Sequence, residues 1–474
     1  MSDIAVIFVA LTLEKVFCLW YTLDVISQFP IMVFREMSLQ NSFLKGVFTI
    51  MKLSEMSRAE LTEFKEKNLK AYEDYKALGL ALNMSRGNPC TEQLDLSVDM
   101  LKIFDDGNFK GENDLDVRNY GILDGIPEAK TLFADLLGIS ADETIIYGNS
   151  SLNAMFFCVQ TAYNKGILGQ KPWSQYEKVK FLCPVPGYDR HFKVTEFFGI
   201  EMINIPMTPT GPDMDMIEKL VADDETIKGI WCVPQYSNPD GISYSDETVK
   251  RFASLKPKAK DFRIFWDNAY CIHHLTDKPE YILNILDEAK KVGNENIVYI
   301  FASTSKVTFP GAGVAVMGAS KENIEDIKKF LGISIIGYDK MNQLRHVRYF
   351  GSAENMKEHM KKHMAIIAPK FNLVCEKLKA EIEPLGIASW TEPKGGYFIS
   401  FNSLDGCAKK IVKLCAEAGV TLTGAGATFP YGVDPCDKNI RIAPTYPTLA
   451  DLEKALEIFI TCVKLVSAEK MLAE

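Results

Sequence analysis

Lys306 is the residue whose setting is best suited to covalent chemistry. It follows the apolar run Ile297–Phe301 and a group of hydroxyl side chains, and it precedes Gly311 and Gly313. Burial beside a strand disfavours the charged ammonium, so this lysine can lose its proton more easily than a surface lysine. A neutral lysine is a nucleophile that forms Schiff bases with carbonyl compounds. The alternative interpretation is an ordinary solvated lysine.

Two polar residues follow other apolar runs. Asp267 ends the run that begins at Arg263, and a carboxylate there can hold the proton of a pyridinium ring, which then accepts electrons. Asn238 follows Gly229–Val233, and its side chain can donate a hydrogen bond to a phenolate oxygen on the same ring. Structural interpretations also exist, since Asp267 suits a helix N-cap and Asn238 suits a turn.

The segment Gly148–Ser151 leads from the predicted strand Thr144–Tyr147 into a predicted helix, Leu152–Ala162. Backbone N–H groups and hydroxyls at the start of a helix form a natural site for a phosphate group. Small residues are also common at strand-to-helix turns, so this segment alone is unspecific.

The elements that must position these residues alternate along the chain. Stretches with helical character separate seven short apolar runs, which are Thr144–Tyr147, Val179–Val185, Met202–Ile205, Gly229–Val233, Arg263–Trp266, Ile297–Phe301 and Gly313–Met317. This alternation predicts an α/β fold around a mostly parallel sheet. Ligands of such sheets bind outside the carboxyl ends of the strands, where Lys306, Asp267 and Asn238 are expected.

A second, smaller α+β domain is expected from both chain ends. A long charged helix pattern from about Glu354 leads to a strand pair near Tyr397–Phe401 and Asn439–Ile442, with a helix at about 406–417 between them. Ser57 and Glu60 form a capping box for a helix that we expect to return to this domain. The predicted division is 51–105 and 356–474 for the small domain and 106–355 for the large one.

Residues 1–50 form an apolar N-terminal extension of uncertain status. Charged residues interrupt it, so no run reaches the ~18–20 residues of a membrane span, and it lacks the basic start of a signal peptide. Three interpretations stay open: an interfacial anchor, an additional packed helix, or sequence upstream of a true start at Met51. The last is favoured because the capped helix begins just downstream.

Composition and charge exclude several classes of protein. A chain of 474 residues is too long for one hydrophobic core. A net charge of −9 argues against a nucleic-acid partner, because binding to the phosphate backbone needs a basic surface. Eleven cysteines without a C-x-x-C pair indicate neither a disulfide framework nor a zinc site, and they predict reduced thiols in a cytoplasmic protein.

The chemical residues together, in their order along the chain, resemble one family. From about Met51 onward the chain is similar to the fold-type I pyridoxal-phosphate (PLP) enzymes of the class I aminotransferase group. The subgroup it most resembles is the type Ic aspartate aminotransferases, which are related to the effector domains of MocR-like regulators. This likeness implies a large domain with a seven-stranded, mostly parallel sheet. The segments that carry it are Ser85–Pro89, Asn119–Ala129, Ser303–Lys306 and Gly424–Gly432.

The resemblance implies a role for each matching residue. Lys306 would form the internal aldimine with pyridoxal 5′-phosphate and move the proton between the substrate α-carbon and the cofactor. Asp267 would pair with the pyridine nitrogen, and Asn238 and Tyr270 would hydrogen-bond the ring oxygen. Tyr188 would stack on the ring. The phosphate would be held by Gly148, Asn149, Ser150, Ser151 and Ser303.

Further implied roles concern the substrate and a second subunit. Arg441 would hold the substrate α-carboxylate in a bidentate fork, with the backbone of Gly87 against the same carboxylate. Tyr120 would reach the phosphate from a neighbouring subunit, which implies a homodimer. The implied partners are an amino acid and a 2-oxo acid, with L-aspartate and 2-oxoglutarate expected in a ping-pong reaction. The alternatives are a PLP-binding regulator of the MocR type, or an aminotransferase or lyase with another substrate.

One position departs from the pattern of this family. Most class I members carry an arginine eight residues after the lysine, where this chain has Val314. Arg345, Arg348 and Arg86 are candidates for supplying the missing charge. The group that would recognise a distal carboxylate of the substrate stays equally open.

Metal and nicotinamide sites are not expected. His359 and His363 have the spacing of a metal-binding pair but lack the glutamate of an H-E-x-x-H motif, so we expect them on a solvated helix face. The adjacent His273 and His274 are expected to border the site. The glycine turns of the chain do not open a β-α-β unit with the third glycine that a dinucleotide fingerprint requires.

Overall fold

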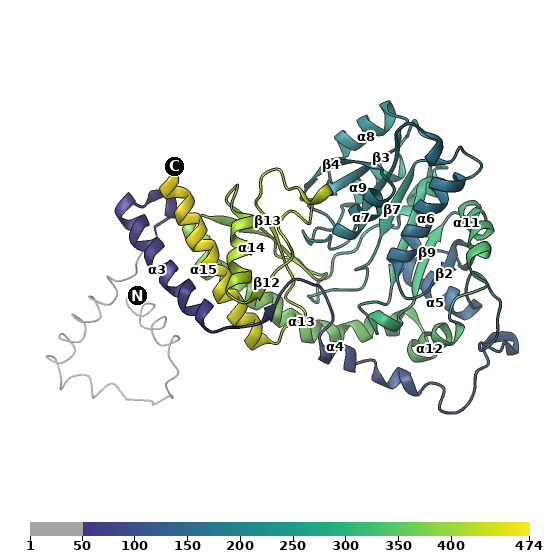
Figure 1. The fold of residues 1–474 in the computed structure, drawn as a ribbon. Coiled ribbons are helices and arrows are strands. Elements are labelled where there is room, and N and C mark those ends of the chain that lie inside the picture. The colour runs from purple at the N-terminus through teal and green to yellow at the C-terminus, as the bar shows by residue number, and fades with distance from the viewer. Residues whose placement is uncertain (1–50) are drawn as a thin grey trace, which may run out of the picture. The chain divides into compact units, whose positions relative to one another are not determined.

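A large sheet carries most of the residues considered above. The computed structural model describes residues 51–474, and the predicted extension lies outside the described residues. Figure 1 shows the fold of this part, in which the sheet has the strand order β2-β9-β8-β7-β6-β3-β4-β5. The strands are β2 (Thr144–Ile146), β3 (Lys180–Val185), β4 (Glu201–Thr208), β5 (Gly211–Pro212), β6 (Ile227–Cys232), β7 (Arg263–Asp267), β8 (Val298–Ser303) and β9 (Ala315–Ala319).

The pairing confirms the prediction of a mostly parallel sheet. Strands β4, β3, β6, β7 and β8 pair in parallel, and antiparallel pairs involve β9 and β5. All seven predicted strands are present. The sheet has eight strands where seven were expected, and the additional strand is β5. The chain reverses after β4, where the Thr208 hydroxyl donates to the Gly211 carbonyl at 2.8 Å, and β5 is too short to show an alternating pattern.

Helices cover both faces of this sheet, and others pack in the C-terminal part of the chain. All α-helices of the described residues are α3 (Arg58–Ala77), α4 (Thr91–Asp95), α5 (Pro127–Leu137), α6 (Ser151–Lys165), α7 (Asp189–Phe197), α8 (Met214–Asp223), α9 (Asp246–Ala253), α10 (Ile285–Lys291), α11 (Lys321–Ser334), α12 (Lys340–Phe350), α13 (Ala353–Glu381), α14 (Ala408–Glu417) and α15 (Leu449–Ala473). Short 3-10 helices lie between them, at Leu53–Glu55, Val98–Lys102, Glu112–Asp114, Ala141–Glu143, Trp173–Gln175, Glu295–Ile297, Pro310–Ala312, Glu383–Leu385 and Pro430–Gly432.

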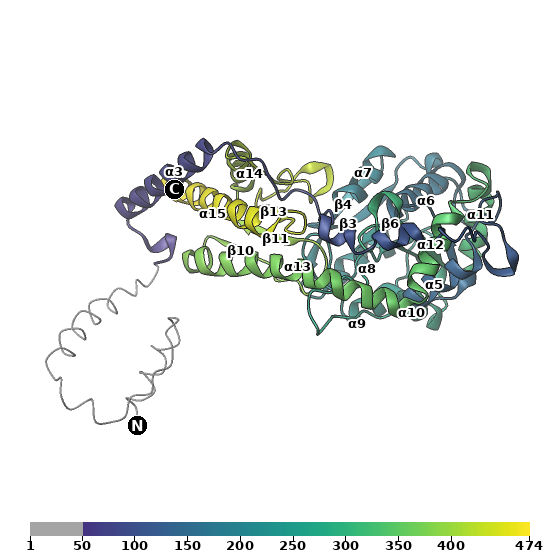
Figure 2. The ribbon, with the colours of Figure 1, turned by 90° about the horizontal axis from the view of Figure 1, so that it is seen from below.

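Alternating side chains of the central strands enter two separate cores. Phe181 and Trp231 point to a core shared with α6, α7 and α11. Leu182 and Ile230, which are adjacent to Phe181 and Trp231 in the same strands, point to a core shared with α8, α9 and α10. Figure 2 shows the strands between these two groups of helices. Burial on both faces explains why the strands appear in the sequence as continuous apolar runs.

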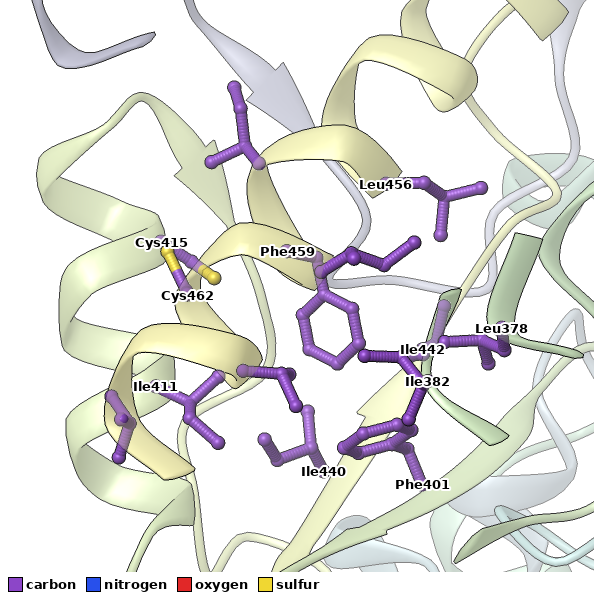
Figure 3. Packing of buried hydrophobic residues seen from close by; sticks show 14 of the residues in the cluster. Leu378, Ile382, Phe401, Ile411, Cys415, Ile440, Ile442, Leu456, Phe459 and Cys462 are labelled. Atoms are coloured by element: carbon purple, nitrogen blue, oxygen red, sulfur yellow. The ribbon is translucent and has the colours of Figure 1, made fainter. Parts of the chain in front are cut away.

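The C-terminal part contains the predicted strand pair and a third strand. In this antiparallel sheet β11 (Ile399–Ser403) lies between β10 (Ala388–Trp390) and β13 (Asn439–Ile442). One face of the sheet packs on α13, α14 and α15, as Figure 3 shows for Phe401 and Phe459, whose ring centroids are 5.0 Å apart. The predicted helix at about 406–417 is confirmed as α14.

The two ends of the described chain meet in this core. The capping box of Ser57 and Glu60 is present at the start of α3, and α3 packs along α15 (Figures 1 and 2). The short strands β1 (Leu82–Asn83) and β12 (Val420–Thr421) pair in parallel and join the same two regions. Residues Lys52–Glu474 form one compact unit. The boundaries at 105/106 and 355/356 stay a prediction, and the second falls in the first turn of α13.

His346 holds the turn Thr304–Thr308, which carries Lys306. Its buried Nε2 lies 3.2 and 3.0 Å from the two threonine hydroxyls at the ends of this turn. Its Nδ1 lies 2.8 Å from the carbonyl oxygen of Asn342. Burial lowers the pKa of His346 to about 4, so the neutral ring makes these contacts.

The prediction of a solvated face for His359 and His363 is wrong. The two side chains are 5% and 1% exposed, and their Nε2 atoms lie 3.2 Å apart. This face of α13 packs against the turn of Lys306, where His359 Nε2 is 3.1 Å from the Val307 carbonyl oxygen. It also packs against α4, where Gln93 Nε2 donates to His363 Nδ1 at 3.0 Å.

Acidification should weaken the fold through His346. Its pKa of about 4 lies below the ordinary 6.5, so the unfolded chain takes up the proton first as the pH falls. This contribution to stability is complete above pH 6.5 and is lost toward pH 4, with about 2 kcal/mol lost between pH 7 and pH 5. Arg345 adds to the lowering of this pKa, while Asp339 and the bond to the Asn342 carbonyl oppose it.

His346→Gln removes the titrating ring and tests this expectation. Urea unfolding at pH 7 and pH 5 should give a smaller pH-dependent loss of unfolding free energy in the variant than in the wild type, whatever the stability of the variant at pH 7. Equal losses in the two proteins would show that this histidine does not cause the acid sensitivity.

Candidate active site

The carboxyl ends of the parallel strands open onto a cavity of about 590 Å³. Four cationic side chains and two carboxylates line it, so the cavity suits an anionic ligand. The predicted site residues that line it are Lys306, Asp267, Tyr270, Tyr188, Asn238, Ser150, Ser151, Ser303, Arg441 and Gly87. The structure therefore brings together residues from a range of more than 350 positions along the sequence.

Three predicted site residues do not line the cavity within this chain. The Asn149 side chain donates to the carbonyl oxygens of Pro310 and Gly311, each at 3.3 Å. Gly148 is likewise absent from the cavity lining. Tyr120 is 84% exposed and lies beside a different hollow of the surface.

Lys306 follows β8 and is surrounded by aromatic rings. Its Nζ lies 5.3 Å from the centre of the Tyr270 ring and 5.7 Å from that of Tyr397. Burial lowers the pKa of Lys306, and the negative charge of Asp267 partly opposes this effect. The neutral, nucleophilic amine is therefore more accessible here than at an exposed lysine.

Asp267 is the last residue of β7, and His191 holds one of its two oxygens. Asp267 Oδ2 lies 3.0 Å from His191 Nε2, and the His191 ring stacks on Trp231 with centroids 4.6 Å apart. The other oxygen, Asp267 Oδ1, is buried without a hydrogen-bond partner among residues 51–474. A buried carboxylate oxygen of this kind is suited to a charged N–H donor on a ligand.

His191 was not expected from the sequence as a residue of the site. It is buried in the first turn of α7, three residues after Tyr188, so both side chains lie at the same end of this helix. No helix was predicted to begin at Tyr188, and no local pattern of the sequence links His191 to Asp267.

The half-buried Tyr188 and the buried Tyr270 can donate hydrogen bonds into the cavity. Burial raises the pKa of Tyr188 to about 12, with smaller contributions from Asp267 and Asp189 that Arg441 opposes. Burial likewise raises the pKa of Tyr270 well above its usual value. Both hydroxyls therefore keep their protons at neutral pH.

Arg441 extends from β13 and is held by several neighbours. Its Nη1 donates to Asp189 at 2.9 Å and to Asn238 Oδ1 at 3.2 Å, and its Nη2 donates to Thr423 Oγ1 at 3.3 Å. The guanidinium lies 4.7 Å from the centre of the Phe398 ring.

Gly87 lies against the same phenylalanine. A Cβ at this position would approach Phe398 Cζ to 2.6 Å, so a larger residue would displace either the ring or the backbone segment. Glycine is therefore required for the close approach of this segment to the aromatic ring below Arg441.

The start of α6 lies at the edge of the cavity. Ser150 is the N-cap, and Ser150 and Ser151 line the cavity together with Ser303 and Ser305. Free backbone N–H groups and the positive end of the helix dipole favour an anion at this position. Two serine hydroxyls of the turn before Lys306 lie at the same place, where Ser303 Oγ donates to Ser305 Oγ at 3.0 Å and Ser305 Oγ donates to the Asn149 carbonyl oxygen at 3.2 Å.

Val314, which stands where most class I members have an arginine, is buried. Of the three arginines considered as replacements, only one lines the cavity. Arg348 donates to the carbonyl oxygens of Asn108 and Lys110, and Arg345 donates to Asn342. Neither of them is part of the lining, whereas Arg86 is. Arg190, at the start of α7, also lines the cavity, and the sequence analysis did not single it out.

Comparison with known proteins places the chain in a family. The family model described as "Aspartate amino-transferase" matches residues 56–474. An aspartate aminotransferase of Corynebacterium glutamicum is 43% identical over 425 residues, which are 90% of this chain and 98% of that protein. A Mycolicibacterium smegmatis protein that is named as an aminotransferase is 46% identical over 427 residues, which are 90% of this chain and 100% of that protein.

A solved structure supports the same assignment. The crystal structure of an aspartate transaminase from Corynebacterium glutamicum is similar with a TM-score of 0.86 and 43% identity, covering 89% of this chain and 99% of that one. The residues that the family model matches, 56–474, include every strand of the large sheet and of the C-terminal sheet. The chain belongs to the aspartate amino-transferase family.

Proposed function

We propose that this protein is a PLP-dependent aminotransferase that moves the amino group of L-aspartate to 2-oxoglutarate. The observation that carries the proposal is the presence, in one cavity, of Lys306, an Asp267 with a free buried oxygen, and Arg441. The Corynebacterium glutamicum relative, named an aspartate aminotransferase, supports L-aspartate as the amino donor.

The residues present fit the proposed cofactor. Asp267 Oδ1, buried and without a partner, is a suitable acceptor for a protonated ring nitrogen. The start of α6 and Ser303 would hold the phosphate, and Tyr188 would pack on the ring. Asn238 and Tyr270 would donate to the ring oxygen. When bound, PLP supplies a cationic ring that withdraws electrons from the substrate α-carbon.

The chain's own residues would control the proton and the substrate. Lys306 Nζ, whose pKa burial lowers, would take the proton from the substrate α-carbon and return it to the cofactor side. Arg441 would hold the α-carboxylate, and this fixed point orients the bond to hydrogen toward Lys306. The buried His191 would hold Asp267 in position.

We also propose that the protein works as a homodimer with shared sites. Tyr120 supports this, because its exposed ring lies outside the cavity of its own chain and is free to reach the phosphate in a partner.

A cytoplasmic location stays a prediction. Ten free thiols among residues 51–474 accord with a reducing compartment. Within these residues, no helix has both the length and the apolar character that crossing a bilayer requires.

Lys306→Ala should abolish amino transfer and leave the fold intact. Wild-type protein mixed with PLP should show a visible absorption band that changes when L-aspartate is added, and the variant should show no such change. Lys361→Ala, which removes an exposed lysine of α13, is the matched control and should behave as the wild type. Full turnover in Lys306→Ala would exclude the proposed role.

The same assay tests the two parts of the proposed function separately. Absence of any visible band in the wild type would exclude the cofactor. A band that another amino acid changes, but L-aspartate does not, would exclude the proposed donor. Tight cofactor binding without turnover of any amino acid would favour the regulatory alternative.

Arg441→Lys should impair substrate binding more than cofactor binding. A lysine keeps the positive charge but cannot form two parallel hydrogen bonds to a carboxylate. We expect kcat/KM for L-aspartate to fall about tenfold or more, mainly through KM, while PLP affinity stays close to that of the wild type. Arg251→Lys, which affects a surface ion pair, is the control. An unchanged KM would contradict the role of Arg441.

Mixed dimers test the shared site. Tyr120→Ala and Lys306→Ala should each lower activity when prepared alone. Refolded together, they should regain activity, because in a mixed dimer one site combines an intact Lys306 with an intact Tyr120 from the other subunit. No regain in verified mixed dimers would show that Tyr120 does not act across an interface.

A further inference from the structure

The proposed reaction leaves Asp189 without a role, although it lines the cavity beside Arg441. Asp189 Oδ1 lies 2.9 Å from Arg441 Nη1, and the side chains are 30% and 7% exposed respectively. The arginine that would bind the substrate α-carboxylate is therefore already paired with a carboxylate of its own chain.

This ion pair occupies hydrogen-bond donors that a substrate carboxylate would use. Arg441 Nη1 has two N–H groups, and it donates to both Asp189 and Asn238. A carboxylate bound end-on needs one N–H from Nη1 and a parallel one from Nη2. It would also lie beside the negative charge of Asp189. End-on binding of an α-carboxylate therefore requires one existing partner of Nη1 to leave, whereas the buried Nε has no hydrogen-bond partner within residues 51–474.

Asp189 is the partner that can leave most easily. Within residues 51–474, its carboxylate accepts a hydrogen bond from Arg441 alone, and it lies at the solvent-accessible first position of α7. Asn238 is 4% exposed, and the proposed function needs it at the ring oxygen. Arg441 itself is fixed by Thr423 and by the ring of Phe398. Because the Asp189 side chain is 30% exposed, rotation about its own bonds would be enough to turn the carboxylate toward solvent.

We propose that Asp189 is a displaceable latch on Arg441, an inference that rests on the proposed function. The latch occupies the guanidinium until a carboxylate able to make a two-point contact replaces it. Amino acids and 2-oxo acids can accept two parallel hydrogen bonds from Nη1 and Nη2, whereas a monatomic anion such as chloride has one acceptor atom and cannot. A latch closed nine-tenths of the time raises the apparent Kd of a carboxylate about tenfold.

Calorimetric titration of the PLP-loaded protein with succinate measures the latch directly. Succinate offers carboxylates but has no amino group, so it binds without reacting. Asp189→Asn should bind succinate about tenfold more tightly than the wild type. Asp246→Asn removes an exposed carboxylate from the first turn of α9, outside the cavity, and should leave the succinate Kd unchanged. Unchanged or weaker succinate binding by Asp189→Asn would overturn the latch and indicate that Asp189 only positions Arg441.

Two further measurements keep the test decisive. Asp189→Ser, which also lacks the charge and suits a helix start, replaces Asp189→Asn if that variant fails to fold. Chloride should compete with succinate more strongly in either uncharged variant than in the wild type, and in Asp189→Glu it should compete about as weakly as in the wild type. Equal chloride competition in all variants would contradict the exclusion of small anions.

The outcomes separate this inference from the proposed function. If L-aspartate leaves the visible band of the wild type unchanged, but Asp189→Asn binds succinate more tightly, the donor assignment fails and the latch stands. If L-aspartate reacts as expected and succinate binding does not tighten, the latch alone fails.

Discussion

Parallel pairing of β6, β7 and β8 is the constraint on which the site depends. Trp231 pairs with Phe265, and Phe265 pairs with Tyr299, so the three strands end at one edge of the sheet. Apolar side chains on both faces fix this register, because a slip by one residue would exchange the residues of the two cores. Residues that leave the strands therefore meet at this edge, although about 70 positions separate Asn238 from Lys306.

Residues whose location depends on the end of a strand could be placed from the sequence. Asp267 and Lys306 follow continuous apolar runs, and such runs locate strand ends without knowledge of the packing. His191 has no such marker, since it contacts Asp267 from the first turn of a helix that comes from another part of the chain. A contact between two segments that are distant in sequence leaves no trace in the pattern of either one.

The direction of side chains was harder to predict than the position of the backbone. His359 and His363 lie among charged neighbours such as Lys361 and Lys362, so the local sequence favoured solvent. The packing of α13 against the turn of Lys306 decided otherwise. Asn149 is a similar case, because its side chain donates a hydrogen bond to the Pro310 carbonyl oxygen instead of pointing into the cavity. Tertiary packing, which periodicity does not report, set each of these orientations.

The charge of the whole chain and the charge of the cavity have different consequences. A net charge of −9 argues against a partner with a phosphate backbone, but salt screens exposed charges beyond about 8 Å at physiological ionic strength. A small anion inside the cavity responds mainly to Lys306, Arg86, Arg190 and Arg441, and two carboxylates oppose them. Hydrogen bonds already engage one oxygen of each carboxylate, at His191 and at Arg441. An acidic protein can therefore bind dianionic ligands, because the cations nearest the ligand act through the least solvent.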